Sequence, residues 1–176
     1  MPPLTTSLFV SILLLTIPVN LIAGSADLDN LFESLRTAPN ETMAREYENK
    51  IWLQWFKSGD KEIDLLMQQA MQKRRNYDFN GALDIINQVI GLKPDYAEAW
   101  NQRATVHFHQ QKYDKSLQDI ARTLELEPRH FGAMAGRTVI RLQQMKPALA
   151  RQNVLQALQL HPYLKERTFF PDLMVE

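Results

Sequence analysis

The 176-residue sequence contains no cysteine. Disulfide bonds and thiolate metal sites are therefore excluded, and the fold has to be stabilised by packing alone. Lysine plus arginine and aspartate plus glutamate number 20 each, so the chain has no net charge and lacks the basic surface typical of nucleic-acid-binding proteins. The basic triplet Lys73-Arg74-Arg75 is expected to end a helix, where cations suit the negative end of the helix dipole. We expect no nucleic-acid partner.

Motifs for catalysis and for metal binding are also missing. The six glycines form no phosphate-binding loop, and neither a G-x-x-x-x-G-K nor a G-x-S-x-G motif occurs. The histidines do not have the spacing of metal ligands on one helical face: His107, His109, His130 and His161. We therefore expect no catalytic residue, no metal and no cofactor, and we interpret the chain as a non-enzymatic protein.

The N-terminus has no charged side chain before Asp27. In this stretch the apolar run Leu8–Ile17 precedes the small residues of positions 23–26, a pattern typical of a cleaved export signal. No basic residue comes before the run, and residues 8–26 approach the length of a membrane span, so an uncleaved anchor is the alternative. In both cases we expect the domain to lie outside the cytoplasm, in the bacterial periplasm. Membrane contact is expected only through residues 1–26, if they are retained.

Residues 27–62 carry the signals of two helices. Asp27 is placed to cap a helix over Leu28–Thr37, and Asn40 is placed to cap a longer helix that ends near Lys57. The second helix has one apolar face, which we expect to be core: Ala44, Tyr47, Ile51, Trp52, Trp55 and Phe56. The two helices predict an irregular hairpin that stacks ahead of the following segment.

The following segment repeats itself every 34 residues. Prolines mark the interval at Pro94, Pro128 and Pro162, and apolar or small residues align in columns such as Ile86, Ile120 and Val154, or Ala82, Ser116 and Ala150. This period is typical of a solenoid of helical hairpins. We predict three units, 63–96, 97–130 and 131–164. We interpret residues 165–176 as a cap over the last unit, with a partner-docking segment as the alternative.

The units resemble the tetratricopeptide repeat family, whose pattern is W-x2-L-G-x2-Y, then A-x3-F, then P. The second unit supplies Trp100, Ala104, Tyr113, Ser116, Ile120 and Pro128. The resemblance covers about residues 63–164 and implies an all-α, right-handed superhelical solenoid of antiparallel hairpins. The chain is also similar to small exported repeat proteins of alphaproteobacteria, which supports the expected location.

Charged residues occupy positions that are apolar in the family: Arg103 and Arg137 replace leucine, and Lys73, His107 and Arg141 replace an aromatic residue. A buried guanidinium needs a carboxylate partner or a route to water. We expect an internal ion pair of Arg103 with Asp119 or Glu125. A positively charged binding slot is the alternative.

The resemblance implies a concave groove lined by the first helix of each hairpin. It is expected to bind a peptide or helix of another protein through Met67, Met71, Arg74, Asn101, Thr105, Phe108, Val139 and Leu142. Methionine adapts to varied apolar side chains, and the Asn101 amide is suited to pairing with a peptide backbone.

Some family members hold a peptide's terminal carboxylate with a clamp of lysine, asparagine and arginine. The clamp positions are occupied here by Met67, Met71, Gln102, Gly132 and Gly136, so this activity is not expected.

The alternative to groove binding is a membrane-tethered scaffold subunit of an envelope complex. It would assemble through its terminal helices, using Trp52 and Trp55 or the Phe169-Phe170 tail.

Overall fold

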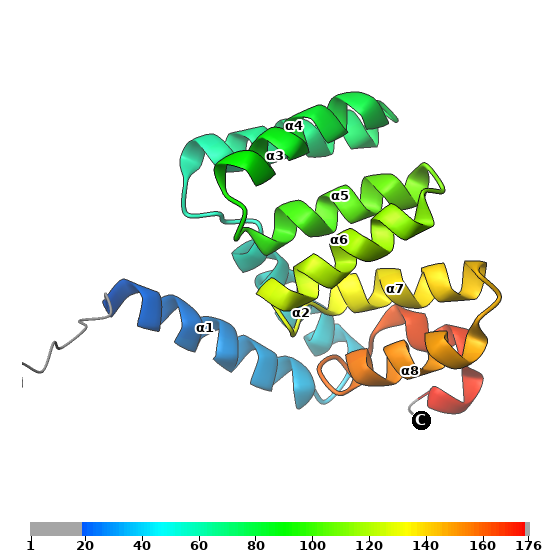
Figure 1. The fold of residues 1–176 in the computed structure, drawn as a ribbon. Helices are drawn as coiled ribbons and strands as arrows, with labels where there is room; N and C mark the ends of the chain where they lie inside the picture. Colours follow the sequence, from blue (N-terminus) through cyan, green and yellow to red (C-terminus); the bar gives the residue numbers. More distant parts are fainter. Residues whose placement is uncertain (1–18, 175–176) are drawn as a thin grey trace, which may run out of the picture.

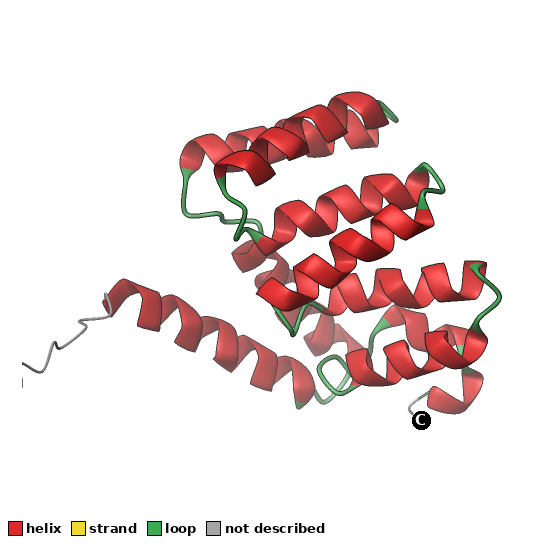
Figure 2. Ribbon diagram, viewed as in Figure 1, coloured by secondary structure: helices red, strands yellow, loops and turns green. Residues whose placement is uncertain are grey.

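The computed structural model describes residues 19–174, and within this range it contains eight α-helices, two short 3-10 helices and no strand. The α-helices are α1 (Val19–Arg36), α2 (Glu41–Trp55), α3 (Lys61–Arg75), α4 (Phe79–Leu92), α5 (Ala97–His109), α6 (Tyr113–Leu126), α7 (Phe131–Gln143) and α8 (Pro147–Leu158). The pairs α3–α4, α5–α6 and α7–α8 form antiparallel hairpins that stack from top to bottom in Figure 1. Figure 2 shows that short loops join the helices. The predicted all-α solenoid of helical hairpins is confirmed.

The first helix begins earlier than expected. The predicted cap at Asp27 is wrong, because α1 starts at Val19 and runs through Asp27 to Arg36. Residues 19–26 contain two alanines and no proline, so nothing in their sequence stops the helix. Residues 1–18, which hold most of the predicted signal or anchor, lie outside the described residues. In the part of the chain that the structure describes, none of the helices combines the length and the apolar character needed to cross a membrane.

Three of the later helix starts carry a local signal in the sequence. Asn40 caps α2, and its side chain accepts a backbone hydrogen bond of 3.0 Å. Asp60 caps α3 in the same way, and Pro147 lies in the first turn of α8. Asp114 does not cap a helix, because α6 already begins at Tyr113. Asp114 lies in the first turn instead, where its charge suits the helix dipole.

The three hairpin turns share a left-handed residue at the same place in each unit. Tyr77, Gln111 and Met145 have φ angles of 60°, 58° and 55°, and they follow one another at intervals of 34 residues. A side chain with a Cβ atom makes this conformation unfavourable by about 1–2 kcal/mol. The tight turn therefore stores strain in every hairpin.

Replacing Gln111 by glycine is expected to stabilise the chain by about 0.5–1 kcal/mol. Glycine removes the left-handed strain, and its larger entropy in the unfolded state offsets only part of that gain. Urea unfolding followed by circular dichroism measures the effect. Gln110→Gly is the matched control, because Gln110 has a negative φ of −81°, and it should not stabilise. Equal effects of the two substitutions would contradict the assignment of strain to Gln111.

The N-terminal hairpin α1–α2 does not stack ahead of α3–α4, and this expectation was wrong. It packs against the opposite end of the array and shares one core cluster with α7, α8 and the tail, formed by Phe32, Leu35, Ala44, Ile51, Trp55, Phe131, Met134, Ala135, Ala157 and Leu164. The predicted apolar face of α2 is therefore core. Its large rings find room on α7, where Gly132 and Ala135 are small, whereas α3 exposes polar residues such as Gln68 and Gln69.

The tail lies in the position predicted for a cap. It forms the 3-10 helices η1 (Lys165–Phe169) and η2 (Pro171–Leu173), and η1 contacts α7 and α8. Leu164, just before η1, is buried in the core cluster shared with α2. Arg167 is also buried and donates a hydrogen bond of 3.1 Å to the carbonyl oxygen of Pro162. The tail thus covers the end of the last hairpin.

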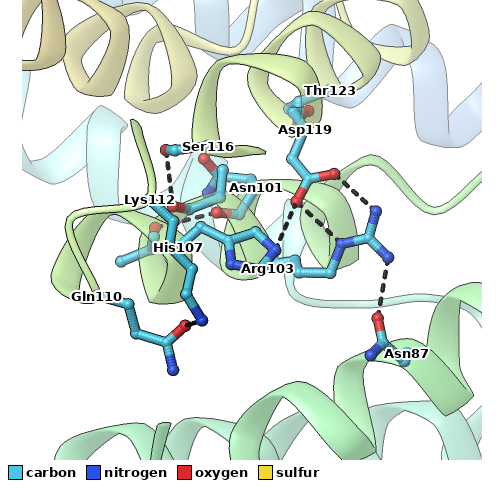
Figure 3. A network of polar contacts seen from close by, with 11 residues as sticks. Asn87, Asn101, Arg103, His107, Gln110, Lys112, Ser116, Asp119 and Thr123 are labelled. Atoms are coloured by element: carbon cyan, nitrogen blue, oxygen red, sulfur yellow. Dashed lines mark hydrogen bonds and ion pairs between the residues drawn. The ribbon is translucent and has the colours of Figure 1, made fainter. Parts of the chain in front are cut away.

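The charged residues of the second hairpin form an internal network. Arg103 donates from Nε and Nη2 to the carboxylate of Asp119 at 2.9 and 2.7 Å, and from Nη1 to Asn87 on α4 at 2.9 Å (Figure 3). The predicted ion pair of Arg103 with Asp119 is therefore confirmed. The other candidate, Glu125, pairs with Arg122 on the surface. The network ties α4, α5 and α6 together inside the array.

Candidate functional site

The concave side of the array holds a cavity of about 910 Å³. Residues of α5 and α7 form its floor, α2 forms the opposite wall, and residues 163–168 of the tail close one end. We call this cavity the concave pocket; among its lining residues are Arg45, Trp52, Arg74, Gln102, Phe108 and Gly136.

Five of the eight expected groove residues line the concave pocket: Arg74, Asn101, Thr105, Phe108 and Val139. The remaining three do not line it. Met67 is 2% exposed because its side chain packs in the core between the first hairpin and α5. Met71 and Leu142 are half-buried at other places on α3 and α7. Arg103 and Arg137 do not line the concave pocket either, so the charged slot that was the alternative for them is absent from it.

The wall formed by α2 was not predicted from the sequence. Glu41, Arg45, Glu48, Trp52 and Phe56 follow one another at intervals of three or four residues, so they share the helix face that lines the pocket. The rings of α2 approach α7 closely at Gly132, where an added Cβ atom would lie 2.5 Å from the Trp52 ring. The pocket is therefore closed between α2 and α7 at this point.

A buried carboxylate organises the floor of the concave pocket. Glu98 is 1% exposed and accepts hydrogen bonds from the side-chain amides of Gln102 at 2.6 Å and Asn101 at 3.1 Å. Its third partner is His130 Nε2, at 3.0 Å. His130 Nδ1 accepts a hydrogen bond from the backbone N–H of Ala133, so the proton of a neutral ring lies on Nε2 and is donated to Glu98.

This network changes the role expected for Asn101. Its amide N–H is engaged with Glu98 inside the protein, and the side chain is only 6% exposed. The network also joins α5 to the start of α7, because His130 caps that helix. His130 in turn stacks on Trp55 of α2, with ring centroids 4.1 Å apart. Glu98 thus connects the floor of the pocket to its opposite wall.

Charged side chains of α2 are held by the far end of the chain. Glu48 lies 3.3 Å from His161, and this hydrogen bond lowers the pKa of the Glu48 carboxyl. Glu41 pairs with Arg45 at 2.6 Å and lies 3.7 Å from Arg167 of the tail. The contacts with His161 and Arg167 connect α2 to the third hairpin and the tail.

Arg74 at the end of α3 has a different environment. Its guanidinium lines the concave pocket but makes no hydrogen bond or ion pair with a side chain of the described residues. Burial lowers the pKa of Arg74, and the negative charge of Glu98 opposes this effect. Arg74 is thus a half-buried cation without a bonded partner among those residues.

The arrangement offers surfaces for binding. Within the described range, no three histidine, aspartate or glutamate side chains come together in a way that could hold a metal ion. The lining combines small residues and amide groups with aromatic rings and charged side chains. Such a mixture of apolar and polar lining is typical of a site that orients a ligand.

Comparisons with known proteins agree with the repeat pattern. The family model described as tetratricopeptide repeat matches residues 97–130. A TPR repeat-containing protein of Rhizobium etli is 46% identical over 112 residues, which are 62% of this chain and 53% of that protein. The DnaJ protein P58IPK homolog A of Oryza sativa subsp. japonica is 30% identical over 69 residues, 39% of this chain and 14% of the rice protein. The chain thus spans about half the length of the rhizobial relative and less of the rice one.

Two solved structures share the fold. The first TPR of Spaghetti (RPAP3), bound to the HSP90 peptide SRMEEVD, has a TM-score of 0.60 and 18% identity, and the match covers 65% of this chain and 92% of that one. The crystal structure of MamA has a TM-score of 0.53 and 16% identity, with 80% and 81% covered. Residues 97–130 thus match a tetratricopeptide repeat, and the 34-residue period and the stacked hairpins agree with the fold of these two structures.

Proposed function

We propose that this chain is a non-enzymatic interaction module that binds a short segment of another protein in the concave pocket. The observation that carries the proposal is the pocket itself, which at about 910 Å³ has the size of a ligand site and a lining of rings, amides and charges. The repeat fold supports it, because solenoids use their concave surfaces for binding. The similar repeat domain of RPAP3 holds a peptide of HSP90.

The shape of the pocket favours an extended segment over a helix. A helix with its side chains is about 10–12 Å wide. Trp52 lies against Gly132 and closes the space between α2 and α7, and the tail closes the end near Lys165. An extended chain is narrower and can present alternate side chains to α2 and to the floor.

The scaffold alternative receives less support. It assigned assembly to Trp52 and Trp55 or to the Phe169-Phe170 tail, in which Phe169 is 52% exposed. Trp55 is 8% exposed and Trp52 packs on α7 of the same chain, so neither tryptophan ring is free to bury itself against a second protein without unpacking α2. We place binding in the concave pocket, whose lining joins several elements, rather than at the exposed ring of the tail.

Replacing Gly136 by leucine is expected to lower the affinity for the bound segment by about tenfold or more. Gly136 lines the pocket, and an added Cβ atom would meet only Ile120, at an ordinary contact distance of 3.6 Å. The fold therefore tolerates the substitution, while the longer side chain fills the pocket. The matched control is Gly91→Leu on α4, where an added Cβ atom meets nothing within 4 Å and which is not part of the pocket lining.

The ligand for this test comes from a library of random linear heptapeptides, selected on the whole chain and measured by fluorescence anisotropy. Selected peptides should bind the wild type and Gly91→Leu equally and Gly136→Leu weakly. If no peptide is selected, or if Gly136→Leu binds as the wild type does, the concave pocket is not the binding site.

We also propose that the module acts outside the cytoplasm, in the bacterial periplasm. The support is the uncharged stretch before Asp27, with its apolar run and small residues. N-terminal sequencing of the protein isolated from its own cells tests this: a mature start near Asp27 is expected for a cleaved signal. Retained Met1 together with a cytoplasmic location would overturn the proposal.

A further inference from the structure

Arg74 is a cation of the concave pocket whose charge is not balanced by a bonded partner among the described residues. The side chain is half-buried, and its Nε atom is buried without an acceptor. Removing a guanidinium from water without an acceptor costs free energy, because the hydrogen bonds to water are lost and not replaced. The two terminal nitrogen atoms of Arg74 are not among the buried atoms, so a bound group that offers them an acceptor gains hydrogen bonds without displacing a partner inside the protein.

The nearby carboxylate of Glu98 does not serve as this acceptor. One of its oxygen atoms accepts from Gln102, and the other accepts from Asn101 and His130. It makes no hydrogen bond to Arg74, and it is 1% exposed beneath the floor. Both carboxylate oxygen atoms of Glu98 are therefore already hydrogen-bonded to residues of the floor and to His130.

The other charged side chains that line the concave pocket also leave the Arg74 guanidinium available for a bound segment. The lining contains four basic and three acidic side chains: Arg45, Arg74, Lys165 and Arg167, with Glu41, Glu48 and Glu166. Two of the acidic side chains are engaged, because Glu41 pairs with Arg45 and Glu48 pairs with His161. Within the lining, positive charge is thus in excess.

An apolar surface stands next to Arg74. Arg74 and Phe108 occupy equivalent positions of adjacent units, 34 residues apart, on the neighbouring helices α3 and α5. Both side chains line the concave pocket. A segment that crosses from α3 to α5 meets a cation and then an aromatic ring.

We infer that the concave pocket selects an extended segment with an acidic side chain, which Arg74 binds through its guanidinium, beside an apolar side chain that packs on Phe108. This inference rests on the proposed function and specifies the chemistry of its partner. The guanidinium can hold a carboxylate with two parallel hydrogen bonds, a geometry that an amide cannot match.

The test uses the peptides selected on the whole chain, each synthesised with its acidic residue and with the corresponding amide. Arg74→Gln removes the cation, and Arg75→Gln is the matched control, because Arg75 is an exposed neighbour on α3 that does not line the pocket. The acid-to-amide change should weaken binding to the wild type and to Arg75→Gln by about tenfold or more. It should have little effect on binding to Arg74→Gln. The melting temperature of Arg74→Gln should not fall, because the lost charge has no bonded partner.

The outcomes separate the two proposals. If peptides bind and Gly136→Leu blocks them, but the acid-to-amide change has the same effect on the wild type and on Arg74→Gln, then Arg74 is not the anchor and the proposed function stands. Selection of peptides without acidic residues would likewise overturn the anchor and leave the proposed function in place. If no peptide binds the wild type, both the proposed function and the anchor are wrong.

Discussion

Replacing Glu98 by alanine is expected to destabilise the chain by about 3–5 kcal/mol, as the removal of one partner from a buried charged network does. The substitution leaves the side-chain donors of Asn101, Gln102 and His130 without their acceptor in a place that is almost fully buried. Each buried donor left without a partner costs about 1–3 kcal/mol. The cap of α7 and the stack on Trp55 depend on the same histidine ring.

Urea unfolding of the full chain measures this effect. Glu125→Ala is the control, because its carboxylate is 64% exposed and pairs only with Arg122 on the surface. The control should change stability by at most about 0.5 kcal/mol. Similar values for the two variants would mean that the Glu98 network does not stabilise the floor.

Replacing Trp55 by alanine is expected to cost about 3–5 kcal/mol, the usual effect of removing a large ring from a core. Trp55 packs against rings outside α2, with centroid distances of 5.9 Å to Phe32, 4.9 Å to Phe131 and 4.1 Å to His130. These contacts join α1 and α2 to the third hairpin. The loss should therefore appear first as faster amide exchange in α1 and α2.

Thermal unfolding and hydrogen exchange of the variant measure both parts of this prediction. Leu53→Ala lies on the same helix, but Leu53 is 62% exposed, so it should have little effect. If Trp55→Ala instead loosens α3 and α4 and leaves the third hairpin unchanged, the N-terminal hairpin packs ahead of the array in solution.

The repeating part of the fold was predictable because each of its signals is local and periodic. The 34-residue columns place the hairpins, and Asp60 and Pro147 mark helix starts by their own chemistry. The left-handed turn residues, such as Gln111, recur at the same interval. Their conformation could not be predicted from the sequence, because glutamine is not a residue that signals it.

The position of α2 could not be predicted by the same means. No period relates α2 to α7, and a helix with an aromatic face can pack at either end of a solenoid. The decisive residue is Gly132, which makes room for Trp52. In the sequence, Gly132 stands out only as a missing clamp residue.

Only the part of the candidate site that the repeats contribute could be predicted from the sequence. Residues of the repeats, such as Arg74 and Phe108, follow from the equivalence of the units. The α2 wall and the tail do not, because they lie outside the repeats. Asn101 lines the pocket, but its engagement with Glu98 depends on His130 of the next unit and is visible only in three dimensions.

The central claim is that a partner segment lies in the concave pocket between α2, α5 and α7. Mapping amide chemical shifts of the isotope-labelled whole chain during titration with a selected peptide tests it most directly. The largest shifts are expected at pocket residues of different elements, including Arg74, Thr105, Phe108 and Gly136. Shifts confined to α4 and α8, which contribute no residue to the pocket lining, with the pocket residues unchanged, would contradict it.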